Sequence, residues 1–252
     1  MVAPQDEVRE QGHSAVFTQP TEKPARTGSD EVEHQQRLEA IIRADPDLMA
    51  LLAKARGLAL PQWRLVAGCL YQTVWNALTG RPRGHGIRDY DLIYFDDADL
   101  SWEAEDAVLR RAAPSLAGGV GPVEIRNQAR VHLWFERRFG SPYPPLPSAD
   151  AALSRYAAIV HAVGVRFEPD DALSIVAPFG LADLFGMVLR PNPAIANGPA
   201  YAAKAERARA LWPEITVLPW PGVGDPAVKC AGDTAAVSNG LSPGPSPFST
   251  SG

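Results

Sequence analysis

An acidic strand decides the fold: Ile87-Arg88-Asp89-Tyr90-Asp91-Leu92-Ile93-Tyr94-Phe95. Successive side chains of a β-strand alternate between its two faces, so Asp89 and Asp91 are expected on the same face, about 7 Å apart along the backbone. Two carboxylates this close repel each other unless a cation lies between them. Oxygen ligands of this kind suit Mg²⁺ or Mn²⁺, and Mg²⁺ usually takes one or two protein carboxylates together with substrate phosphates. The pair therefore predicts a divalent metal site, although an isolated Asp-x-Asp also occurs on solvated edge strands without any ligand.

A second apolar run, residues 63–70, precedes this strand and contains Gly68 followed by Cys69. Apolar residues then recur with helical spacing as far as Leu78. The expected order is strand, glycine, helix. A glycine at such a junction either makes a tight turn or lets a phosphate approach the backbone, where the helix N-terminus offers N–H groups and a positive dipole end. Gly68 and Cys69 are therefore candidate phosphate-binding residues.

A third acidic position lies in the segment 123–126, which alternates between apolar and charged residues as a strand with a polar face does. Glu124 is on that polar face. If this strand pairs beside the aspartate strand, three carboxylates meet around one point, an arrangement that can hold two metals and orient an attacking hydroxyl. Asn127 and Arg130 follow Glu124 closely enough to line the same cleft.

These residues resemble the nucleotidyltransferases of the DNA polymerase β superfamily, and more closely a bacterial branch of predicted nucleotidyltransferases. The superfamily pattern combines a glycine at a helix start, two acids one residue apart and a third carboxylate on a later strand. It is matched by Ala67-Gly68-Cys69, by Asp89-Tyr90-Asp91 and by Glu124, with cysteine where serine or glycine is usual. Longer strings carry the closer resemblance over roughly residues 35–220, namely 74–76, 89–95, 123–134 and 177–185.

The resemblance implies an α/β (α+β) fold with a mixed β-sheet flanked by helices, and a Mg-dependent nucleotidyltransferase activity. In that reaction the α-phosphate of a nucleoside triphosphate is attacked in line, pyrophosphate leaves, and a nucleoside monophosphate passes to an acceptor that the sequence does not identify: a small molecule, a protein or an RNA. Asp89 and Asp91 would bind Mg²⁺ or Mn²⁺, and Glu124 would complete a second metal site or act as general base. The nucleotide-contacting candidates are Gly68, Cys69, Asn127, Arg130 and Lys204.

Two other functions are compatible with the same residues. One is a catalytically degenerate module that binds a nucleotide or a partner protein without turnover. The other is a metal-dependent phosphohydrolase that uses the carboxylates with water as the nucleophile.

Composition agrees with an enzyme that works in the cytoplasm and not in a membrane. The chain has 252 residues, 46% of them hydrophobic, and no apolar segment approaches the roughly 20 residues that cross a bilayer. No secretory signal is recognised at the N-terminus, and only Cys69 and Cys230 are present, so a reducing compartment is expected. The formal net charge of −5 argues against broad nucleic-acid binding.

The composition of the two ends predicts disorder, because both are too poor in large apolar residues to offset chain entropy. We expect a disordered tail over residues 1–32, a nucleotidyltransferase-like domain over 33–221 and a second disordered tail over 222–252. Within the domain, the pattern predicts a hairpin from the strands 162–167 and 172–177, and helices over 181–189 and 201–211.

Overall fold

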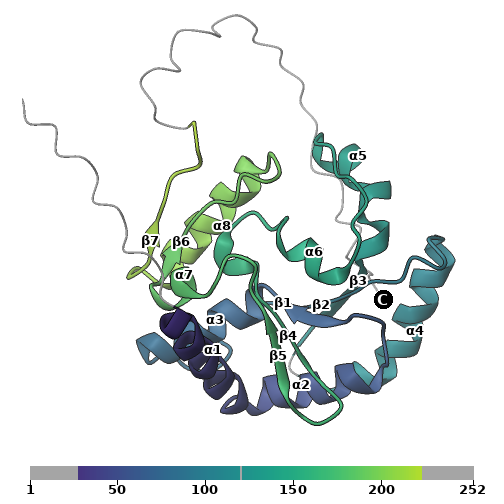
Figure 1. Ribbon diagram of the computed structural model, residues 1–252, viewed down its shortest axis with the longest axis horizontal. Helices are drawn as coiled ribbons and strands as arrows, with labels where there is room; N and C mark the ends of the chain where they lie inside the picture. Colours follow the sequence, from purple (N-terminus) through teal and green to yellow (C-terminus); the bar gives the residue numbers. More distant parts are fainter. Residues whose placement is uncertain (1–27, 120, 223–252) are drawn as a thin grey trace, which may run out of the picture.

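The computed structural model describes residues 28–119 and 121–222 (Figure 1). The helices are α1 (Gly28–Arg43), α2 (Pro46–Gly57), α3 (Gly68–Thr79), α4 (Trp102–Leu116), α5 (Phe135–Phe139), α6 (Ala149–Leu153), α7 (Ala182–Phe185) and α8 (Gly198–Leu211), with the 3₁₀ helices η1 (Gln128–Leu133) and η2 (Ile159–His161). The strands are β1 (Arg64–Val66), β2 (Tyr90–Tyr94), β3 (Val123–Asn127), β4 (Gly164–Phe167), β5 (Leu173–Val176), β6 (Val188–Leu189) and β7 (Thr216–Val217). In these ranges, none of the helices is long and apolar enough to cross a membrane.

A five-stranded mixed sheet in the order β3-β2-β1-β4-β5 lies at the centre of the fold. Strands β2 and β3 are parallel, and the other neighbours in the sheet are antiparallel. A parallel pair needs a crossover connection, and α4 supplies it between β2 and β3. Figure 1 shows α2 along one side of the sheet and α6 on the other. The predicted mixed sheet flanked by helices is confirmed.

The two faces of the sheet bury different cores. On one face, Leu65, Leu92 and Ile125 belong to a large apolar cluster with residues of α1, α2 and α3. On the other face, Val66 and Ile93 pack in a smaller cluster with residues of α6 and η1. Side chains alternate along a strand, so residue 91 shares its face with Ile93 and with the smaller cluster. This alternation places the side chain of Asp91 on the face of the smaller cluster.

Local sequence signals explain where several helices begin. Asp45 caps α2, and its carboxylate accepts hydrogen bonds from the N–H groups of Asp47 and Leu48 at 3.0 and 3.2 Å. Ser148 caps α6 by accepting from the N–H of Ala151 at 3.1 Å. Both caps stabilise elements that hold the sheet from opposite faces.

Helix α8 is fixed to α3 by a buried indole. The side chain of Trp212, just beyond the end of α8, is 0% exposed, and its ring centroid lies 5.5 Å from that of Trp75. Its N–H donates to Oδ1 of Asn76 at 3.0 Å, while Nδ2 of Asn76 donates to the carbonyl of His85 at 2.9 Å. The string 74–76 therefore joins α3, α8 and the loop that leads into β2.

The structure confirms the predicted hairpin as β4 and β5. The helix predicted over residues 201–211 is confirmed as part of α8. The helix predicted over 181–189 is wrong beyond Phe185: Met187 has a φ of 51°, and Val188–Leu189 pairs with β7 as a strand. A left-handed residue interrupts helical hydrogen bonding whatever the apolar spacing. Helix α1 begins at Gly28, so it includes residues 28–32 of the predicted N-terminal tail. Residues 1–27 of that tail and residues 223–252 of the predicted C-terminal tail lie outside the described residues.

Replacing Trp212 by alanine is expected to lower the free energy of unfolding by about 3–5 kcal/mol, because a fully buried aromatic side chain and a buried hydrogen bond are both lost. Urea unfolding followed by circular dichroism measures the change. Trp102 is 63% exposed, so Trp102→Ala is the matched control and should cost under about 1 kcal/mol. Equal losses in the two variants would contradict the proposed anchoring of α8.

Candidate active site

The sheet register places Asp91 between a neutral neighbour and an acidic one. Val66 on β1 pairs with Asp91 on β2, and Asp91 pairs with Glu124 on β3. Paired residues of adjacent strands point to the same face, and adjacent strands lie about 4.8 Å apart. The carboxyl groups of Asp91 and Glu124 therefore start from neighbouring points on one face. Asp89 lies just before β2, in an exposed loop position.

A cavity of about 380 Å³ opens beside this row. Asp89 and Asp91 line it, and so do Gly68 at the start of α3 and the basic residues Lys204 and Arg207 of α8. The cavity therefore has a carboxylate side, a helix N-terminus and a cationic side. That combination suits a ligand that carries phosphate groups and arrives with a metal ion.

The junction between β1 and α3 is strained. Ala67 has φ 59° and ψ −117°, a conformation that is unusual for a residue with a Cβ atom, and its side chain cannot cap the helix. Gly68 follows as the first residue of α3, and a Cβ atom added to it would lie 3.2 Å from Nε2 of Gln72. The chain thus brings an uncapped helix N-terminus and a bare backbone to the cavity.

The charges around Asp91 are not balanced. Burial, followed by the nearby carboxylates of Asp89 and Glu124, raises the pKa of Asp91 to about 6, and the cations of Lys204 and Arg126 only partly oppose the rise. A carboxyl group with this pKa gains from binding a proton or a cation.

The inner wall of the cavity holds polar atoms without hydrogen-bond partners in the structure: Oε1 of Gln72, Nε2 of His161 and Nε of Arg207. Burial, together with the charge of Lys204, holds the pKa of His161 well below its usual range, so its imidazole is neutral. Another guanidinium nitrogen of Arg207 donates to the carbonyl of Gly86. These three residues are not among those predicted from the sequence. Gln72 carried one signal, since it lies one helical turn after Gly68.

The other predicted site residues lie away from the cavity. Cys69 is 0% exposed, its thiol donates to the carbonyl of Val66 at 3.5 Å, and burial raises its pKa well above the usual range. The side-chain amide of Asn127 donates to the carbonyl of Asp96 at 2.7 Å, and Arg130 forms an ion pair with Glu105. The side chains of Asn127 and Arg130 thus connect β3 and η1 to the segment 96–105. The structure thus brings together Gly68, Asp89, Asp91 and Lys204 in one cavity, with Glu124 beside Asp91 on the sheet.

The acidic residues of the cavity differ from a preformed metal site. In the described ranges, 28–119 and 121–222, no three His, Cys, Asp or Glu side chains are grouped so that they could hold a metal ion. Glu124 instead faces Arg126, with Oε2 3.8 Å from Nη2. The chemistry of the donor set nevertheless fits Mg²⁺ or Mn²⁺, because Asp89 and Asp91 offer carboxylate oxygens to one cavity, where burial and then the charge of Asp89 disfavour the ionised form of Asp91.

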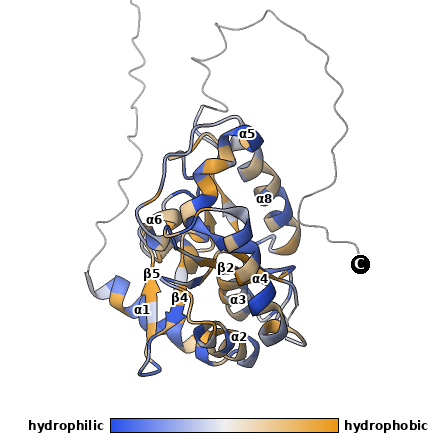
Figure 2. Ribbon diagram, turned by 90° about the vertical axis from the view of Figure 1, so that its right-hand side faces the viewer, coloured by the Kyte–Doolittle hydropathy of each residue, from blue (hydrophilic) through white to orange (hydrophobic). Residues whose placement is uncertain are grey.

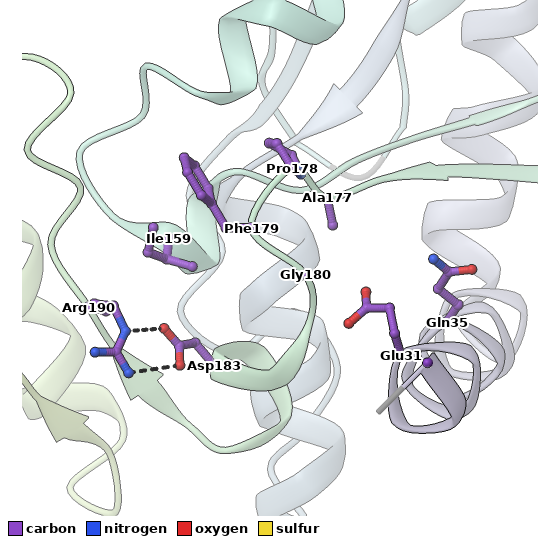
Figure 3. Close-up of a pocket in the computed structure, with 10 residues that line it drawn as sticks. Glu31, Gln35, Ile159, Ala177, Pro178, Phe179, Gly180, Asp183 and Arg190 are labelled. Carbon is purple, nitrogen blue, oxygen red and sulfur yellow. Dashed lines mark hydrogen bonds and ion pairs between the residues drawn. The ribbon is translucent and has the colours of Figure 1, made fainter. Parts of the chain in front are cut away.

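A larger hollow of about 690 Å³ lies between α1 and the segment 177–190 (Figure 3). Its buried carboxylate, Asp183, is already neutralised by Arg190 at 2.6 Å. On the α1 side, Glu31 accepts a hydrogen bond from the N–H of Leu181 at 3.2 Å. These contacts give the string 177–185 a structural role, because they join α7 to α1 and to β6. The two acids of this hollow, Glu31 and Asp183, thus already have partners within the fold.

The sheet, the strand-glycine-helix junction and the neighbouring carboxylates define a nucleotidyltransferase-like α/β domain. A family model described as "Nucleotidyltransferase" matches residues 53–217, more than half of the chain, and the chain belongs to this family. A solved structure described as revealing a CCA-adding enzyme head domain is 27% identical, with a TM-score of 0.58 over 74% of this chain and 96% of that chain. The comparison with curated proteins gave no match.

Asp91→Asn is expected to stabilise the metal-free protein at about pH 7.5 by roughly 1–2 kcal/mol. Asp91 is half-buried, so solvent screens part of the effect of its charge. A raised carboxyl pKa means that the folded state binds the proton more tightly than the unfolded state. Ionisation therefore lowers stability as pH rises from about 4 to about 6. Asparagine cannot ionise, so the gain should shrink by more than half at about pH 4.5. Urea unfolding at both pH values measures it, with the exposed Asp97→Asn as control. A gain independent of pH would contradict the electrostatic account.

Proposed function

We propose that the protein is a divalent-metal-dependent nucleotidyltransferase that transfers a nucleoside monophosphate from a nucleoside triphosphate to an acceptor. The observation that carries the proposal is the pairing of Asp91 with Glu124 in adjacent strands, beside a cavity that is also lined by Asp89, Gly68 and three basic residues. Membership of the nucleotidyltransferase family supports the type of reaction. The metal, the nucleotide and the acceptor belong to the proposal.

Asp89 and Asp91 would hold Mg²⁺ or Mn²⁺. The ion would supply charge neutralisation on the phosphates and a lower pKa for the acceptor hydroxyl. Glu124 would complete a second metal site or take the proton of the acceptor hydroxyl. For either role Glu124 must leave Arg126, a half-buried pair whose atoms lie 3.8 Å apart.

The triphosphate would lie against the N-terminus of α3. The backbone at Gly68 allows a phosphate to approach, and Lys204 and Arg207 supply positive charge from α8. The acceptor oxygen forms a bond to the α-phosphorus while the bond to the α,β-bridging oxygen breaks and pyrophosphate leaves. The protein's part is to position these groups and to neutralise charge. Of the remaining candidates, Cys69 would contribute through its backbone, and Asn127 and Arg130 by holding β3 in place.

Three finer statements complete the proposal. Placement in a bacterial branch of the DNA polymerase β superfamily rests on the strings 89–95 and 123–134. The catalytic domain is taken as residues 33–221. A cytoplasmic location rests on the cysteine usage of the sequence.

Product analysis tests the proposed activity. The protein is incubated with α-labelled nucleoside triphosphates, Mg²⁺ or Mn²⁺, and separate small-molecule, protein and RNA fractions as acceptors. A transferase yields pyrophosphate and a labelled acceptor. A phosphohydrolase yields free mono- or diphosphate, and a degenerate binding module yields neither. Either of the last two results would replace the proposal.

Asp89→Asn and Asp91→Asn should each reduce transfer by orders of magnitude while the protein stays folded, because neutral amides hold a divalent ion poorly. Initial rates in the labelled-nucleotide assay measure the loss. Asp97→Asn removes a carboxylate just beyond the same strand and should retain full activity. Unchanged rates in both site variants would remove the metal-site hypothesis.

Gly68→Ala should weaken triphosphate binding more than it weakens folding. The new methyl group would lie 3.2 Å from Nε2 of Gln72 and would occupy the space through which a phosphate approaches the backbone. Titration calorimetry with a non-hydrolysable triphosphate is expected to show a loss of about tenfold or more. Gly57, at the end of α2, has open space around it, so Gly57→Ala is the matched control. Normal affinity in Gly68→Ala would show that the backbone contact is misplaced.

A further inference from the structure

A second cavity, of about 270 Å³, adjoins the active-site cavity. The two share Tyr156 and Lys204 in their linings, so these side chains form the boundary between them. Nothing in the phosphate chemistry proposed above uses the second cavity, which we call the aromatic cavity.

Three aromatic rings line the aromatic cavity in addition to Tyr156. Phe135 packs on Tyr143 with ring centroids 4.5 Å apart, and Trp134 lies 6.1 Å from Phe135. Trp134 and Phe135 are half-buried, so their rings are partly available to a ligand. Rings arranged in this way favour a planar, apolar group.

The charge of the aromatic cavity is one-sided. Arg126, Arg155 and Lys204 line it, and none of its lining residues is acidic. The Arg155 guanidinium lies 6.0 Å from the centroid of the Tyr143 ring, so charge and aromatic surface occur together. This cationic concentration stands out in a chain whose formal net charge is −5. It favours an anion over a neutral ligand.

The positions of the two cavities follow from the order of the strands. The active-site cavity lies toward β1, where Gly68 begins α3. The aromatic cavity lies toward β3, where Arg126 follows Glu124 on the same face and pairs with Ile93. Asp91 lines the active-site cavity, and its strand neighbour Glu124 lies on the same strand as Arg126 of the aromatic cavity. In-line displacement places the attacking hydroxyl and the leaving pyrophosphate on opposite sides of the α-phosphorus.

We propose that the aromatic cavity binds the acceptor, and that the acceptor is a small planar aromatic anion that carries the reacting hydroxyl. This inference rests on the proposed function, which places the triphosphate on the β1 side. The volume holds about one small ring system. Arg155 and Trp134 are then specificity-determining residues.

Binding of 4-hydroxybenzenesulfonate, a planar aromatic anion with a hydroxyl group and little affinity for metals, tests the inference. Titration calorimetry and ligand-observed NMR on the full chain should show binding that the neutral 4-hydroxybenzyl alcohol does not match. Arg155→Ala should weaken it about tenfold, and Arg155→Lys should retain most of it, because the charge remains. Arg137→Ala removes an exposed charge from nearby α5 and should leave the affinity unchanged within about twofold. Trp134→Ala should also weaken binding, and circular dichroism confirms that each variant is folded. Equal affinity in Arg155→Ala and wild type would overturn the inference.

The same titration in the presence of Mn²⁺ and a saturating non-hydrolysable nucleoside triphosphate separates the two proposals. Simultaneous binding of triphosphate and probe supports an acceptor site. Competition between them would assign the aromatic cavity to the nucleotide itself and overturn the inference, while the proposed function stands. A triphosphate that does not bind at all would overturn both.

Discussion

The repulsion between neighbouring carboxylates is the constraint on which the site depends. The register that pairs Asp91 with Glu124 fixes two negative charges on one face of the sheet, and Asp89 adds a third from the preceding loop. Hydrophobic packing of Leu92 and Ile125 on the opposite face holds that register. A one-residue shift would turn the acids toward the larger apolar cluster and move Leu92 and Ile125 out of it, so packing and site geometry are determined together. The free energy of the apolar core therefore maintains an electrostatic arrangement that is unfavourable until a cation binds.

Two elements that are distant in sequence bring positive charge to these carboxylates. Helix α8 is held on α3 by Trp212, and it carries Lys204 and Arg207 over the active-site cavity. Strand β3 carries Arg126, which lies 3.8 Å from Glu124. The carboxylates of the site thus have basic residues of both α8 and β3 near them. Figure 2 shows the hydrophobic strand β2 deep in the molecule, with the hydrophilic segments of α4, α5 and α8 around it. Substrates that bring both phosphates and an anionic acceptor match this pattern of charge.

Local patterns allowed much of the fold to be predicted from the sequence. The strand-glycine-helix order at Gly68, the hairpin of β4 and β5, and the alternation around Glu124 all depend on neighbouring residues. Pattern failed at Met187, because a left-handed turn and a pairing with the distant β7 override the apolar spacing. Burial decided the placement of Cys69, Asn127 and Arg130, whose partners lie in the core or in other loops. Gln72, His161 and Arg207 come from three separate elements, and only the tertiary fold shows that they line the active-site cavity together.

Anomalous diffraction from a crystal soaked with Mn²⁺ and a non-hydrolysable nucleoside triphosphate tests the central claim most directly. The account predicts an anomalous peak within coordination distance of the carboxylates of Asp89 and Asp91, with the triphosphate against Gly68 and the side chain of Glu124 turned away from Arg126. A nucleotide bound elsewhere, or a manganese peak not coordinated by Asp89 and Asp91, would contradict it.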